Sequence, residues 1–177
     1  MKKLVLALVA SFILGSFAVQ SLNAQTKRGS FFLTGGSQFS FQTTFTEGNE
    51  EFMLSLSPSF GGFITNDLAL GLSGGVFYLS SSSSVVYSAM PTMTFFFNQG
   101  KGFIPYIEIQ VGYVGISSHG SSANGLGVGA GIGGIQMLNE HVGITLGFQY
   151  LHSRYFSDMR SAKSNAISTA IGLTTFF

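Results

Sequence analysis

The sequence contains no cysteine and few charged residues, and after residue 24 it has no long apolar run. The absence of cysteine excludes disulfide bonds and lipid attachment through a cysteine thiol. Charged residues make up 8% of the chain, whereas a soluble domain carries roughly 25–35% charged residues on its surface. No later stretch approaches the roughly 18 apolar residues of a transmembrane helix. The composition therefore fits neither a soluble domain nor a helical membrane protein.

The first 24 residues differ from the rest. Lys2 and Lys3 precede an apolar run from Leu4 to Val19, and Ala24 follows at a small-residue cleavage site. This pattern predicts a removable signal peptide over residues 1–24, with an uncleaved helical anchor as the alternative. Without its two lysines the chain keeps six basic residues against seven acidic ones, so no basic surface for nucleic acid is expected.

Apolar and small or polar residues alternate from residue 29 to the end. In the segment Val142–Tyr150 every second residue is large and apolar, while the residues between are Gly, Thr or Gln. Side chains alternate between the two faces of a strand, so one face is apolar. Such segments, separated by turn residues, are expected at 30–45, 52–64, 68–79, 85–97, 103–115, 125–138, 142–152 and 165–177.

The position of the charges decides which face meets lipid. Thirteen charged residues follow residue 24, and only Glu108 falls inside an expected strand. A soluble barrel would turn a charged face outward, whereas here the polar face is made of Gly, Ser, Thr and Gln. The sequence thus predicts an all-β domain at 29–177, an eight-stranded antiparallel up-and-down transmembrane β-barrel.

The connections between strands predict the orientation. Three are short, at residues 65–67, 98–102 and 139–141, and the alternate ones, at 46–51, 80–84, 116–124 and 153–164, are on the whole longer and richer in Ser or charge. Bacterial barrels have short periplasmic turns and longer outer loops, which places both termini in the periplasm. Two girdles of outward aromatic residues agree, because Tyr and Phe favour membrane interfaces. The outer girdle is Phe45, Phe52, Tyr78, Tyr87, Tyr113 and Tyr150, and the periplasmic one is Phe31, Phe60, Phe95, Phe97, Phe103 and Phe177.

The chain from 29 to 177 resembles the small outer-membrane barrels of the OmpX and OmpA transmembrane-domain type. The resemblance rests on the regular succession of strands and turns, the segment Phe103–Glu108 and the final residues Ile171–Phe177. The resemblance implies a bacterial outer-membrane location and contact with outer-membrane lipid and lipopolysaccharide. It also implies that Phe177 is the signal for the barrel assembly machinery, although Thr175 stands where such signals often have a second aromatic residue. A ligand outside the cell would bind at the loops.

Two groups of residues are expected inside the barrel. Glu108 lies between Tyr106 and Gln110 on the inward face, where Gln38, Gln149, Ser and Thr can donate hydrogen bonds to its carboxylate; a proton or cation site is the alternative. Bulky apolar residues fill the inward positions at the periplasmic ends of six strands. This expected periplasmic plug consists of Phe32, Phe63, Phe96, Ile104, Met137 and Phe176.

Motifs for catalysis, cofactor binding or metal binding find no support in their context. Gly129–Gly134 contains a G-x-G-x-x-G pattern, but the glycines keep the period of one strand instead of opening a helix. His152 and Ser153 are adjacent in a strand, so they point to opposite faces and form no dyad. We predict no catalytic, cofactor or metal residues and a non-enzymatic structural or surface-interaction role through the outer loops. A small porin-like channel and a lipid acyl-chain enzyme are the alternatives.

The outer loops carry a few charges. Arg154, Arg160 and Lys163 fall in the expected loop four, against one acidic residue, Asp158. Charges in loops are usually only solvated. The alternative is that this basic loop binds lipopolysaccharide phosphates.

Overall fold

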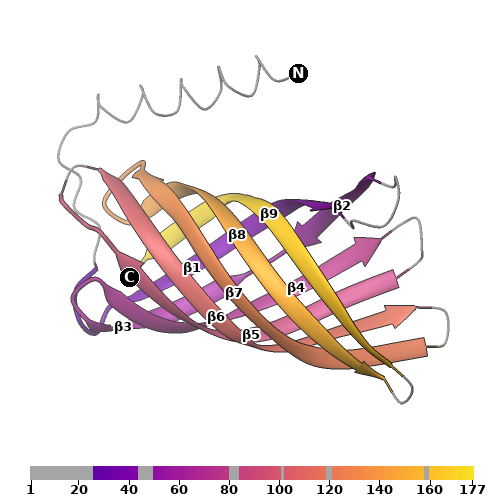
Figure 1. Cartoon of the computed structure of the whole chain (residues 1–177). Helices are drawn as coiled ribbons and strands as arrows, with labels where there is room; N and C mark the ends of the chain where they lie inside the picture. Colours follow the sequence, from indigo (N-terminus) through magenta and orange to yellow (C-terminus); the bar gives the residue numbers. More distant parts are fainter. Residues whose placement is uncertain (1–25, 44–49, 80–83, 101, 119–120, 158–159) are drawn as a thin grey trace.

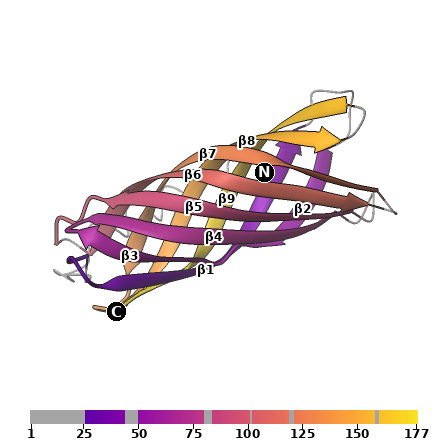
Figure 2. The ribbon, with the colours of Figure 1, turned by 90° about the horizontal axis from the view of Figure 1, so that it is seen from below.

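The computed structural model describes residues 26–43, 50–79, 84–100, 102–118, 121–157 and 160–177. Its nine β segments form one antiparallel sheet that closes on itself (Figures 1 and 2). The segments are β1 Phe31–Thr43, β2 Glu50–Leu56, β3 Ser59–Thr65, β4 Leu68–Leu79, β5 Ser84–Phe96, β6 Phe103–Ser118, β7 Ser121–Met137, β8 Val142–Ser157 and β9 Arg160–Phe176. The expected signal peptide lies outside the described residues. No helix in the described ranges is long and apolar enough to cross a membrane.

β2 and β3 together form one strand of the ring, interrupted at Pro58. Ser37 pairs with Leu56 on one side of the interruption, and Thr34 pairs with Ser59 on the other, so the register does not shift. Proline has no N–H to donate to a neighbouring strand, which explains the break. The predicted closed ring of eight antiparallel strands is therefore confirmed, with β1 paired to β9.

The two ends of the barrel differ in what they hold. Residue 26 and the carboxyl terminus lie at one end, called here the terminal end, where Phe31 N donates to Phe177 O (3.0 Å) and Phe177 N to Phe31 O (2.9 Å). At the opposite end, called the hairpin end, β4 leads to β5, β6 to β7 and β8 to β9.

The prediction of long loops at residues 116–124 and 153–164 is wrong. β6 continues to Ser118 and β7 begins at Ser121, while β8 continues to Ser157 and β9 begins at Arg160. Ser and charged residues are only on average more frequent in loops. Strand pairing can continue through such residues, because the hydrogen bonds between strands are made by the backbone and not by side chains. The β8–β9 hairpin consequently projects from the hairpin end as paired strands (Figure 2).

The outer face is apolar, as predicted. On β6, Ile107, Ile109 and Val111 are 48%, 54% and 55% exposed, whereas Gln110 between them is buried. So much exposed apolar surface is far more than a soluble monomer presents. Most of the aromatic residues expected outside are exposed, including Phe31, Phe60, Tyr78 and Tyr150. The side chains of Phe45 and Phe52 lie outside the described part.

Glycine at position 112 leaves the backbone of β5 very close to where a side chain of β6 would begin. A Cβ at Gly112 would touch the Ala89 carbonyl oxygen and lie 2.7 Å from Met90 Cα, both in the backbone of β5. At Gly74, by contrast, the nearest atom to a Cβ is 3.8 Å away. A side chain at position 112 therefore has no room unless the backbone of β5 moves.

We therefore expect Gly112→Ala to lower the free energy of unfolding by roughly 1–3 kcal/mol, because overpacking must displace β5. Gly74→Ala is the matched control and is expected to change it by less than half as much. Urea unfolding of both variants in the same lipid vesicles measures the difference. Equal losses would show that the β5–β6 approach is not a constraint.

Candidate functional site

The six residues of the expected plug meet inside the terminal end. Each is at most 4% exposed, and with Ala69 and Ile135 they form one buried cluster, the terminal-end cluster. Phe32 and Phe96 have ring centroids 5.4 Å apart, and Phe96 and Phe176 have centroids 6.0 Å apart in an edge-to-face arrangement. Aromatic pairs favour this geometry. Its four phenylalanine rings come from β1, β3, β5 and β9, and its smaller side chains come from β4, β6 and β7.

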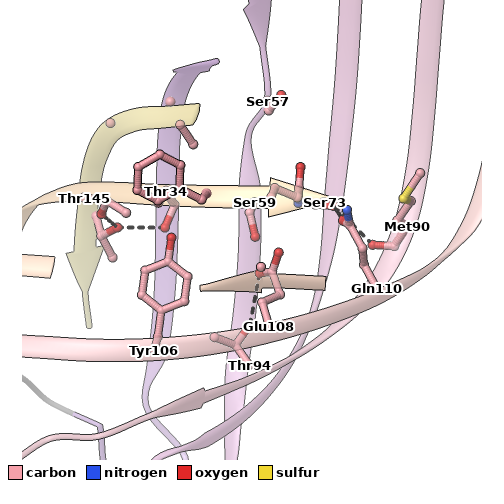
Figure 3. A pocket seen from close by; sticks show the side chains of 18 of the residues that line it. Thr34, Ser57, Ser59, Ser73, Met90, Thr94, Tyr106, Glu108, Gln110 and Thr145 are labelled. Carbon is pink, nitrogen blue, oxygen red and sulfur yellow. Dashed lines mark hydrogen bonds between the residues drawn. The ribbon is translucent and has the colours of Figure 1, made fainter. Parts of the chain in front are cut away.

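A cavity of about 110 Å³ lies next to this cluster inside the barrel (Figure 3). Both polar and apolar side chains line it, and it is called here the polar cavity because Glu108 lies in its wall. Its wall contains Glu108 together with several Ser and Thr hydroxyls, and none of the described lining residues is Lys, Arg or His. An ionised carboxylate away from bulk water needs hydrogen-bond donors to remain charged. The cavity therefore holds one carboxylate among neutral polar and apolar side chains.

The partners of Glu108 come from strands on both sides. Thr94, directly opposite on β5, donates to Glu108 Oε2 (3.1 Å), and the Gln149 side chain also bonds the carboxylate from β8. Gly131 of β7 lies between Glu108 and Gln149 in register. Because Gly131 has no side chain, the two side chains meet across an intervening strand. Sequence reasoning named Gln149 as a donor but named threonine only as a residue type, without identifying Thr94.

The other predicted interior residues are only partly brought together. Gln110 is buried and accepts a hydrogen bond from Ser73 Oγ (3.2 Å) on Oε1. Tyr106 lines the cavity and lies over Gly133 and Gly147, whose Cβ atoms would touch its phenol group. The side chain of Gln38 lies outside the described part. The Tyr106 ring thus fills the space that these two glycines leave.

A second apolar group lies on the inner face toward the hairpin end, and sequence reasoning missed it. Met90 of β5, Val114 of β6 and Leu151 of β8 all approach the bare backbone of Gly127 within 3.0–3.2 Å of where its Cβ would be. Met90 and Val114 are almost fully buried. Met90 and Leu151 also line the polar cavity, which therefore has apolar residues on both sides along the barrel axis.

His152 and Ser153 lie on opposite faces of β8. Ser153 is buried inside, whereas His152 Nδ1 lies 2.8 Å from Asn165 Oδ1 on the outer face. A nucleophile needs a base within hydrogen-bond reach, which this pair does not provide. In the described ranges, no three His, Cys, Asp or Glu residues gather as they would around a metal ion.

Two polar clusters on the outer face near the hairpin end were not predicted. Tyr113 donates to Asn124 Oδ1 (2.6 Å), and Tyr87 donates to the same atom (3.2 Å). Tyr150 likewise donates to Asn165 Oδ1 (2.8 Å). Tyrosine at a membrane interface keeps its ring in the apolar region and its hydroxyl in the polar region. The clusters mark where the outer face changes from apolar to polar.

Solved structures share this fold at low sequence identity. Neisserial surface protein A is 16% identical, with a TM-score of 0.66 over 84% of this chain and 98% of the other. The N-terminal β-barrel domain of Pseudomonas aeruginosa OprF is 16% identical, with a TM-score of 0.60 over 85% and 98%. Ail of Yersinia pestis, solved with the heparin analogue sucrose octasulfate, is 12% identical, with a TM-score of 0.56 over 85% and 99%.

The fold is thus that of the small eight-stranded outer-membrane β-barrels, which confirms the predicted fold class. No protein-family model matches this sequence, and no curated protein matches it either.

Proposed function

We propose that this protein is a closed, non-enzymatic barrel of the bacterial outer membrane that acts through the surface of its hairpin end. The terminal-end cluster carries the proposal, because a lumen packed with six bulky residues leaves no aqueous path through that end. The function then belongs to the exterior. In this proposal residues 1–24 are a signal peptide, both termini lie in the periplasm, and Phe177 is the assembly signal.

Contacts at the barrel seam support a role for Phe177. Its backbone bonds Phe31 in both directions, while its ring is 60% exposed on the outside. An exposed terminal aromatic residue is available to a protein that handles the chain before closure. We assign it to recognition by the barrel assembly machinery.

The hairpin end has the character of an interaction surface. Its outer face carries Arg154 and Lys163 beside polar and aromatic side chains. One structural neighbour, Ail, was solved with a polyanion, sucrose octasulfate. An anionic partner outside the cell fits this surface.

Cysteine labelling on intact bacteria tests this orientation, since the natural chain has no cysteine. Ser122 is exposed at the hairpin end, and Glu140 is exposed in a turn at the terminal end. We expect a membrane-impermeant maleimide to label Ser122→Cys on intact cells and Glu140→Cys only after the outer membrane is opened. Labelling of Glu140→Cys alone on intact cells would invert the orientation, and labelling of neither variant on intact cells would remove the surface role.

A further inference from the structure

Two cationic side chains stand directly opposite each other on neighbouring strands at the hairpin end. Arg154 of β8 pairs in register with Lys163 of β9, and both are exposed on the outer face. Side chains directly opposite in an antiparallel pair lie roughly 5 Å apart at Cβ, and like charges in this position repel. An anion between them would remove that repulsion.

No described carboxylate neutralises this pair. Among the acidic residues whose side chains the structure describes, Asp67 and Glu140 lie in turns at the terminal end, and Glu108 is inside the barrel. The side chains of Glu50, Glu51 and Asp158 lie outside the described part. The Arg154 guanidinium lies over the Phe156 ring at 5.6 Å from its centroid. This cation–π contact orients the guanidinium on the outer face without neutralising its charge.

The surroundings of the pair match the headgroup level of a membrane. Moving from Arg154 and Lys163 toward the middle of the barrel, the next pair on the outer face is His152 and Asn165. The pair after that is Tyr150 and Ile167. Tyr150 and Ile167 are 46% and 64% exposed and begin the apolar face. Four residues of strand separate Tyr150 from Arg154, a distance of roughly 13 Å. The exterior thus passes from apolar to cationic within the depth of one lipid headgroup.

We propose that Arg154 and Lys163 bind the phosphate group of an outer-leaflet lipid whose acyl chains lie against Tyr150, Ile167 and Val128. A phosphate monoester carries close to two negative charges at neutral pH, which two cations match. The apolar surface directly below the cations distinguishes a lipid from a soluble anion, because only a lipid covers both. This inference rests on the proposed function, since it requires the hairpin end to face the outer leaflet.

Binding of lipid A to the detergent-solubilised full-length protein, followed by native mass spectrometry, tests the proposal. We expect lipid A that retains its phosphates to bind more tightly than the same lipid after phosphatase treatment. Arg154→Gln with Lys163→Gln should weaken binding about thirty-fold, or about five-fold for each cation removed. Both side chains are exposed, and unchanged migration of the unheated protein on a detergent gel will show that the variant folds.

The matched control is Lys27→Gln with Arg28→Gln, which removes the same charge from exposed positions at the terminal end. We expect it to leave lipid A binding unchanged. Three results would each overturn the proposal. The protein could bind dephosphorylated lipid A with equal affinity, or the control variant could lose as much affinity as the double variant. Inorganic phosphate, added at the same concentration as lipid A, could displace the lipid. If Ser122→Cys is labelled on intact cells while the double variant binds normally, only this inference fails and the proposed function stands.

Discussion

Planar-bilayer recordings of the unmodified protein are expected to show no steady current. The terminal-end cluster fills the lumen with rings from four strands, and a second apolar group, Met90, Val114 and Leu151, lies on the far side of the polar cavity. An eight-stranded barrel has an interior just wide enough for its own side chains. The side chains of the described terminal-end cluster offer ions no polar group to replace their hydration.

Removing the rings is expected to open the terminal end. Phe32→Ala, Phe63→Ala and Phe96→Ala together should produce a steady current, whereas Phe96→Ala alone should not, because Phe63 and Phe176 remain in contact with centroids 6.3 Å apart. Each buried Phe→Ala change costs about 3–5 kcal/mol. The recordings therefore need protein whose folded state is verified by its gel mobility.

The control removes three aromatic rings from the outside of the same end. Phe31, Phe60 and Phe95 are exposed on the outer face. Their replacement by alanine leaves the lumen filled. We expect this triple variant to remain closed. A stable, ion-selective current through the unmodified protein would contradict the closed barrel and favour the porin-like channel.

Much of this architecture could be predicted because it depends only on the alternation of side chains between the two faces of a strand. That Ile107 faces outward and Glu108 faces the lumen follows from alternation along one strand. It does not require knowing which strand lies beside it. The plug residues are all inward at the same end, so their convergence also follows once the ring closes. These properties are local or follow directly from closure.

Features that depend on register could not be predicted. Thr94 meets Glu108 because these residues are directly opposite in β5 and β6, and register is set by turn geometry that composition does not reveal. The same holds for Met90, Val114 and Leu151, which come from three strands. The Arg154–Lys163 pair was hidden because its residues were assigned to a loop, whereas backbone pairing continues through that polar segment.

The central claim is that the outer face of the ring lies in lipid, and an arginine placed at Ile109 tests it most directly. Ile109 is 54% exposed near the middle of β6, and Ser117 lies on the same face of the same strand beyond Tyr113. Arginine at the midplane of a transmembrane barrel costs about 2–4 kcal/mol, and arginine near the interface costs about 0–1 kcal/mol.

We expect denaturant unfolding in lipid vesicles to show a loss of about 2–4 kcal/mol for Ile109→Arg and of at most about 1 kcal/mol for Ser117→Arg. Ile109→Leu controls for the loss of isoleucine packing and should change the free energy of unfolding little. If Ile109→Arg proved no more costly than Ser117→Arg, the outer face would not be in lipid and the account would be wrong.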